Sequence, residues 1–143
     1  MAGTDVNRVV NAPFEKVWAL ATDLKRWEEW NTLFTKWKSD VPDTLSQDTQ
    51  VTAVLTIMGM ANTIALTVDE YDPPRLVTMS GTGMAGAKVS LTLTVDADGD
   101  STTMSARADF VSQMIVGAIG KAIESAAKKE LDASLDKLAA IVE

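Results

Sequence analysis

The stretch DLKRWEEWN, residues 23–31, lies between a predicted strand and helix on one side and a long series of predicted strands on the other. Residues 4–11 alternate weakly between apolar and polar side chains and predict the first strand. Pro13 then suits the first turn of a helix, where its missing N–H is not needed, and apolar residues at helical spacing continue to about Ala21. The aspartate that opens the quoted stretch can cap a second short helix over residues 24–29. The sequence therefore predicts two short helices after the first strand.

Alternation with a period of two predicts about six strands after this turn. The clearest covers residues 89–95, where Val and Leu alternate with Ser and Thr, as in a strand with one dry and one solvated face. Two prolines after Asp72 end an earlier strand because proline cannot donate to the ladder. Asp98-Gly99 is a strong hairpin signal, and the glycine-rich residues 81–86 indicate a flexible connection. The strands are expected at residues 33–39, 51–57, 64–68, 76–80, 89–95 and 104–110.

A long amphipathic helix is expected from about Ile115 to Val142. Apolar residues at steps of three and four form one stripe along it, namely Val116, Ile119, Ile123, Ala127, Leu131, Leu135 and Leu138. The first third also contains Gly117 and Gly120, and each Gly costs about 1 kcal/mol in a helix interior. Either the helix packs closely on the sheet there, or the small residues leave a void beside Ile119 and Ile123. Because voids cost stability, a void would indicate a ligand.

The order of these patterns predicts an α+β fold. A chain of 143 residues is expected to form one domain, residues 1–143. In it a curved antiparallel sheet of six to seven strands surrounds the long C-terminal helix, with two short helices after the first strand. Val89, Leu91, Leu93 and Val95 are expected on the concave face, opposite the apolar stripe of the helix.

The composition argues against several kinds of site. The chain has no Cys, hence no disulfide, thiolate metal site or Cys nucleophile, and no His, the commonest metal ligand and general base. Its formal charge of −7 repels phosphate backbones and disfavours nucleic-acid binding. The first residues lack the features of a signal peptide, and the apolar residues 114–119 are too few to span a bilayer. We expect a soluble cytoplasmic monomer or homodimer without stable membrane insertion, metal or cofactor.

Two motifs fall short of known sites. Residues 81–88 are not a phosphate-binding loop, because one residue separates the last Gly from the Lys and no helix follows. Asp96, Asp98 and Asp100 have the alternate spacing of a calcium loop, but Ser101 stands where that loop needs Gly. These carboxylates are expected in a solvated hairpin.

Four tryptophans, Trp18, Trp27, Trp30 and Trp37, lie within one short region. Aromatic side chains dominate protein cores, so packing in the core or in a lid is the simpler interpretation. The alternative is that one or two of them line the mouth of a pocket. Trp37 shares a strand face with Leu33 and is the best pocket candidate of the four.

Few residues of this chain are candidates for an acid or a base inside such a fold. Tyr71 and Arg107 are weak catalytic candidates, and in the expected register both lie on strand faces opposite the apolar ones. No pair of carboxylates falls on the predicted inner faces. An apolar cavity without convergent polar groups is more typical of a binding site than of an active site.

Residues 21–31, ATDLKRWEEWN, resemble the segment after the first helix in polyketide cyclase/dehydrase-like proteins of the START-like (SRPBCC, helix-grip) superfamily, and residues 131–138, LDASLDKL, are similar to its final helix. The resemblance spans nearly the whole chain and includes an actinobacterial subgroup, one branch of which is labelled as toxins of toxin–antitoxin pairs. It implies a cavity between sheet and helix that binds lipids, polyketides, sterols or other apolar molecules. Some members cyclise polyketides, but this chain departs from them in having no His.

Three functional hypotheses follow. The first is a module that binds a small hydrophobic ligand, a lipid, polyketide or similar molecule, between the sheet and the C-terminal helix. The second is a polyketide cyclase or dehydratase that uses Tyr71, Arg107 or an ordered water, and the third is a toxin-like interaction protein. For the first, the residues expected to wall the cavity or to lie near it are Trp37, Leu55, Ile57, Leu66, Met79, Leu91, Leu93, Ile119 and Ile123.

Overall fold

A computed structural model describes residues 2–57, 59–83, 87–111 and 117–143. It has the predicted order of one strand, two short helices, a series of strands and a long final helix. The elements are β1 (Ala2–Val10), α1 (Phe14–Ala21), the short 3₁₀ helix η1 (Leu24–Arg26), α2 (Trp27–Trp30), β2 (Phe34–Trp37), β3 (Gln50–Ile57), β4 (Met60–Asp72), β5 (Leu76–Thr82), β6 (Lys88–Asp98), β7 (Ser101–Val111) and α3 (Gly117–Val142).

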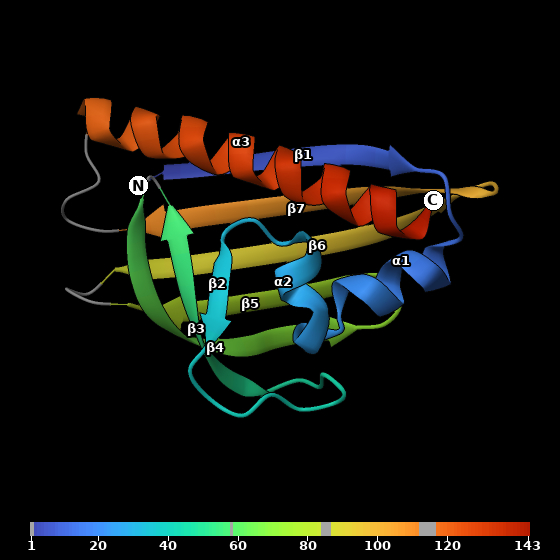
Figure 1. Ribbon diagram of the computed structural model, residues 1–143, viewed down its shortest axis with the longest axis horizontal. Helices are drawn as coiled ribbons and strands as arrows, with labels where there is room; N and C mark the ends of the chain where they lie inside the picture. Colours follow the sequence, from blue (N-terminus) through green and yellow to red (C-terminus); the bar gives the residue numbers. More distant parts are fainter. Residues whose placement is uncertain (1, 58, 84–86, 112–116) are drawn as a thin grey trace.

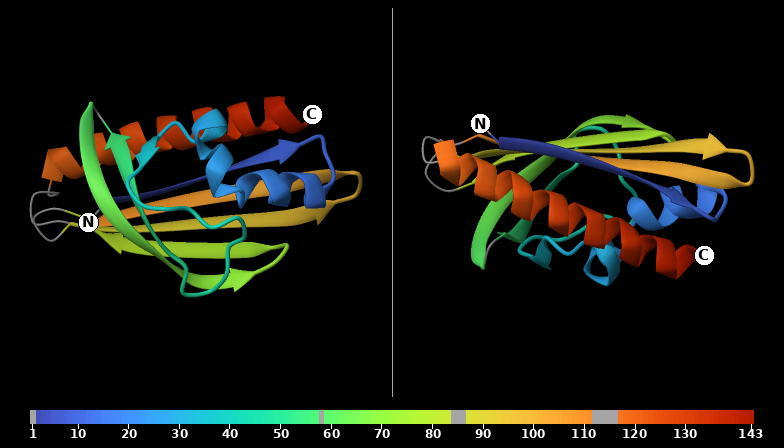
Figure 2. Two further views of the ribbon diagram at one scale, coloured as in Figure 1. Left: turned by 60° about the horizontal axis from the view of Figure 1, so that its bottom comes forward. Right: turned by 90° about the horizontal axis from the view of Figure 1, so that it is seen from above.

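The strands form one curved antiparallel sheet of seven strands in the order β1-β7-β6-β5-β4-β3-β2. From β2 to β7 each strand pairs with its neighbours in the chain, and β1 completes the sheet by pairing with β7. In Figure 1, α3 runs alongside β1 and β7. The right-hand view of Figure 2 shows α3 and the short helices on the same side of the sheet. The predicted α+β helix-grip fold is therefore confirmed.

The inner faces of the strands form the core, as their alternation predicts. On β3, β4 and β7 the inward side chains are buried, including Ala53, Leu66 and Ala106. On β6 the pattern differs along the strand, because Val89 and Val95 are buried whereas Leu91 and Leu93 between them are only partly buried. All four face the concave side, as predicted. The lower burial in the middle of β6 marks a gap in the packing at the centre of the sheet.

The apolar stripe of α3 follows the prediction except at its beginning. Its buried residues are Gly120, Ile123, Ala127, Leu131, Ser134, Leu135, Leu138, Ala139 and Val142. The prediction was wrong for Ile119, which is 57% exposed. Each step of four residues turns about 40° past a full turn of an α-helix, so a stripe extended in such steps from Leu135 drifts off the buried face. Gly120 takes the inward position, and Val116 lies outside the described residues.

A change of register in β4 moves Tyr71 to the face opposite the predicted one. The pairing of β4 with β5 shifts between Val68 and Glu70, so that Val68 opposes Met79 and Tyr71 opposes Val77. One extra residue in a strand reverses the alternation of the side chains beyond it. Tyr71 is therefore partly buried against the core, with its ring 5.9 Å from that of Trp18. The prediction that Tyr71 lies on the outer face was wrong.

The connection predicted at residues 81–86 is shorter than expected, because Gly81 and Thr82 belong to β5. A Cβ atom at Gly81 would lie 2.3 Å from the carbonyl oxygen of Ala65. Glycine at this position thus permits a close approach of β4 and β5. Residues 84–86 lie outside the described residues.

Ile123 and Ile119 allow a matched test of which face of α3 is buried. Ile123 packs against Ile57 and Phe110, whereas Ile119 is exposed. Ile123→Ala should lower the free energy of unfolding by about 2 kcal/mol, the lower end of the range for a buried Ile. Ile119→Ala should change it by less than about 0.5 kcal/mol. Chemical denaturation measures both, and equal losses in the two variants would contradict the assigned face.

Candidate functional site

An apolar cavity lies where the sheet, α3 and the segment from α1 to β2 meet. The inner faces of β3, β5, β6 and β7 form one side. The second half of α3 and the tryptophan-rich turn, which we define as residues 23–31, form the others. The bordering residues are Ala21, Trp27, Trp30, Asn31, Leu33, Leu45, Leu55, Val77, Met79, Leu91, Thr92, Leu93, Ala106, Arg107, Leu131, Ser134 and Leu135. Most of these side chains are apolar, so the cavity suits an apolar occupant.

The cavity is small in this conformation. About 40 Å³ of it is open to the centre of a water molecule, which is room for a few waters. Pockets that enclose drug-sized molecules usually measure about 300–1,000 Å³. A larger ligand therefore requires the walls to move apart.

Aromatic packing holds the tryptophan-rich turn in place over the cavity. The ring of Trp27 lies 6.3 Å from that of Trp30, 6.1 Å from that of Phe34 and 5.3 Å from that of Trp37. The indole Nε1 of Trp27 donates to the carbonyl oxygen of Ala21 at 3.1 Å. The stretch that begins at residue 23 is thus one wall of the cavity, fixed by its own aromatic side chains.

Hydrogen bonds connect this wall to α3. The backbone N–H of Thr32 donates to Ser134 Oγ at 2.9 Å, and the Thr32 hydroxyl donates to the carbonyl oxygen of Glu130 at 2.8 Å. Ser134 is buried, and its hydroxyl donates to the same carbonyl oxygen at 2.8 Å. Although Ser134 borders the cavity, its oxygen is already engaged as donor and acceptor.

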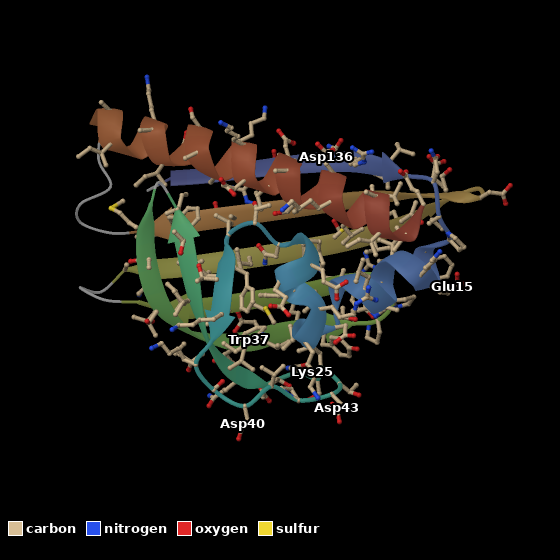
Figure 3. The ribbon with its side chains drawn as sticks, viewed as in Figure 1. Glu15, Lys25, Trp37, Asp40, Asp43 and Asp136 are labelled. Atoms are coloured by element: carbon tan, nitrogen blue, oxygen red, sulfur yellow. The ribbon has the colours of Figure 1, made fainter. Side chains whose placement is uncertain are left out.

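The loop between β2 and β3 contributes Leu45, which is buried. An ion pair between Lys25 and Asp43 joins this loop to η1, and Figure 3 shows the two side chains next to each other. Their mutual hydrogen bond raises the pKa of Lys25 and lowers the pKa of Asp43. Because both groups are exposed, the pair stabilises the loop only weakly. The burial of Leu45 is the stronger anchor.

The predicted ligand-binding residues fall into separate groups. Leu55, Met79, Leu91 and Leu93 border the cavity. Leu66 is fully buried and packs in the core, and Ile57 and Ile123 pack with Phe110 in a second cluster. None of these last three borders the cavity, and Ile119 points to solvent. The void considered beside Ile119 and Ile123 is therefore not where the cavity lies, since α3 contributes Leu131, Ser134 and Leu135 instead.

Trp27 and Trp30 border the cavity, whereas Trp37 does not. The ring of Trp37 packs 4.8 Å from that of Phe34, and its Nε1 donates to the carbonyl oxygen of Leu24 at 3.0 Å. Trp37 therefore supports the wall from behind, which corrects our choice among the four. The spacing of three between Trp27 and Trp30 places both on one face of a helix, a signal that the sequence did contain.

The two weak catalytic candidates do not bring an acid or a base to the cavity. Tyr71 does not border it. Arg107 was correctly placed on the outer face, where its side chain is half exposed and pairs with Asp109 at 2.9 Å and Asp5 at 3.5 Å. These partners, Asp109 first, raise the pKa of Arg107. Arg107 is among the residues that border the cavity, but its guanidinium is held by Asp109 and Asp5 on the outer face.

Trp30 has a polar atom that finds no partner among the residues that the structure describes. The residue is 3% exposed, and no hydrogen-bond acceptor among these residues reaches its buried Nε1. Buried polar groups are nearly always hydrogen-bonded. An unpaired N–H on a residue that borders a cavity is therefore a candidate point of ligand contact.

Neither a cluster of metal-ligating side chains nor a helix that could span a membrane is found in the part of the chain that the structure describes. There, no three acidic side chains gather closely enough to hold a metal ion. Asp96, Asp98 and Asp100 lie exposed around the β6–β7 hairpin. None of the described helices combines the length and apolar character that a membrane span requires.

Comparison with known proteins identifies relatives over almost the full chain. The model of the family described as "Polyketide cyclase / dehydrase and lipid transport" matches residues 1–143. Two Mycobacterium tuberculosis proteins, named "Uncharacterized protein Rv1546" and "Toxin Rv0910", are each 30% identical to this chain. The alignments cover 97% of both chains for the first and 92% of both chains for the second.

Solved structures of similar fold include a START superfamily protein from Mycobacterium smegmatis, with a TM-score of 0.78, 17% identity and coverage of 99% of this chain and 97% of that one. The Zhui aromatase/cyclase from a Streptomyces species matches with a TM-score of 0.77, 18% identity and coverage of 98% and 92%. At these identities the likeness concerns the fold alone. On its sequence match, this chain belongs to the polyketide cyclase/dehydrase and lipid transport family.

Proposed function

We propose that this protein binds a small hydrophobic molecule, such as a lipid or polyketide, in the cavity between the sheet and α3, and that residues 1–143 act as one START-like domain. The observation that carries the proposal is the gap at the centre of the core. Leu91 and Leu93 are only partly buried on the inner face of the sheet, between Val89 and Val95, which are buried. A sequence under no pressure to keep a gap would fill it, because voids cost stability.

The apolar border of the cavity supports binding as the main activity. Burial of apolar ligand surface contributes about 25 cal/mol per Å², reduced by the cost of association. The family supports the same class of ligand. We do not favour the cyclase alternative, since Tyr71 does not border the cavity and the guanidinium of Arg107 is engaged with Asp109 and Asp5.

Entry of a ligand larger than the present cavity requires an opening movement. Two parts of the cavity border come from short elements or a loop: the tryptophan-rich turn, and the loop that carries Leu45. The other parts come from the sheet and from the long helix α3. Short elements with few ladder hydrogen bonds open at lower cost than a central sheet. We propose that the ligand selects a conformation in which the tryptophan-rich turn and the loop with Leu45 have moved outward.

A toxin-like interaction protein remains the second candidate, because one relative of 30% identity is named a toxin. Nothing in the geometry of the cavity speaks for this role. It becomes the leading hypothesis if the protein takes up no apolar molecule.

Filling the cavity should abolish binding without a large loss of stability. Ala106 borders the cavity on β7, so Ala106→Val places two more methyl groups where there is free space. We expect uptake of the neutral fluorescent probe N-phenyl-1-naphthylamine to weaken at least about tenfold, since lost apolar contact and lost volume act together. The melting temperature should stay close to that of the wild type.

Ala108→Val is the matched control for this variant. Ala108 is the next inward residue of β7 and is fully buried, but it does not border the cavity. Overpacking at a filled position costs about 1–3 kcal/mol, so this variant should lose stability and retain uptake. If Ala106→Val is destabilised as much as Ala108→Val, and the wild type takes up no probe, the interior is a filled core and the proposal fails.

Removal of the two former catalytic candidates should leave uptake unchanged. Tyr71→Phe deletes a hydroxyl from a ring that packs on Trp18, and Arg107→Ala deletes a charge from the outer face. The dissociation constant for the same probe, measured by fluorescence titration, is expected to change less than about twofold in either variant. A large loss in either one would revive the enzymatic hypothesis.

A further inference from the structure

We infer that Trp30 determines ligand specificity: its indole N–H donates a hydrogen bond to a carbonyl oxygen of an uncharged, otherwise apolar ligand. The inference rests on the proposed binding function and adds to it the chemistry that the ligand presents. Trp30 differs from Trp27 and Trp37 in the same aromatic cluster, because the indole N–H groups of those two residues are paired within the protein.

The evidence begins with the other indoles of the cluster. Trp27 Nε1 is paired with the carbonyl oxygen of Ala21 and Trp37 Nε1 with that of Leu24. Trp30 Nε1 is buried too, yet no acceptor among the described residues reaches it. A buried donor without a partner destabilises the fold, so its retention calls for an acceptor. Trp30 borders the cavity, and its Nε1 is closed to a water molecule in this conformation, so the opening movement that admits a ligand must also expose this N–H.

The other inward polar groups at the cavity favour an acceptor as well. Asn31 Oδ1 already accepts a hydrogen bond from the backbone N–H of Leu33 at 3.1 Å. The amide NH₂ of Asn31 is therefore the group available to a ligand, and it is a donor. Ser134 Oγ is engaged with Thr32 and Glu130. Among Trp30, Asn31 and Ser134, the groups left without a partner are donors, which suit a ketone, ester or quinone oxygen better than the N–H or O–H of a ligand.

The ligand should also be uncharged. Arg107 is the charged residue at the border, and its guanidinium lies on the outer face with Asp5 and Asp109. A carboxylate inside the cavity would therefore be buried without a countercharge, at a high cost. A neutral carbonyl oxygen needs only a hydrogen-bond donor, which Trp30 supplies.

The test compares two small probes of nearly equal shape, indane and 1-indanone, of which the second has a carbonyl group. Dissociation constants are measured by titration in proton–nitrogen correlation spectra of the nitrogen-15-labelled protein. In the wild type the indole N–H signal of Trp30 should move downfield with 1-indanone and much less with indane. Trp30→Phe should reduce the preference for 1-indanone over indane by about three- to tenfold, the worth of one net hydrogen bond. Trp37→Phe, which removes a paired N–H behind the wall, should leave that preference unchanged.

Each outcome decides between the two proposals. If both probes bind but the preference is the same in Trp30→Phe, or the Trp30 N–H signal responds equally to both, the specificity role of Trp30 is refuted while the binding function stands. That role is also refuted if a water already pairs with Nε1 and 1-indanone does not displace it, since the signal then stays in place. If neither probe binds the wild type, the binding function fails and the inference fails with it. The spectra of the wild type give this answer even if Trp30→Phe does not fold.

Discussion

The contact between one face of α3 and the concave side of the sheet is the constraint on which the rest of this structure depends. A nearly straight helix cannot touch every part of a curved sheet, and α3 runs beside β1 and β7 at one edge (Figure 1). The inner faces of β3, β5 and β6 therefore need another cover. The segment from α1 to β2 supplies it, with Trp27 and Trp30 facing the sheet. The cavity lies where these three surfaces meet.

This arrangement divides the tasks between rigid and adaptable parts. The ladder of the sheet and the long helix fix the floor and one wall, and hydrogen bonds from Thr32 to Glu130 and Ser134 join the remaining wall to the helix. Aromatic contacts around Trp27 hold that wall together. Because it is built from short elements and a loop, the opening that we propose would leave the ladder of the sheet intact.

Much of the fold could be predicted from the sequence, because period-two alternation, prolines after Asp72 and the apolar stripe of the last helix are local signals. The site was less predictable for three physical reasons. An extra residue near position 69 reversed the direction of Tyr71, and bulges leave little trace in alternation. A stripe extended in steps of four residues drifts around the helix, so the prediction put Ile119 on the buried face of α3, whereas it is exposed. The spacing of three puts Trp27 and Trp30 on one face of α2, but that this face borders the cavity depends on how α2 packs on the sheet, a tertiary contact that no local pattern encodes.

The central claim is that an apolar molecule enters this cavity and not merely a surface patch. The most direct measurement is the set of nuclear Overhauser effects between naphthalene and the methyl groups of the protein. The account predicts contacts to the methyl groups of Leu91, Leu93 and Ala106, which border the cavity. Contacts confined to the exposed Ile119, Met60 and Val111, or no contacts at all, would contradict it.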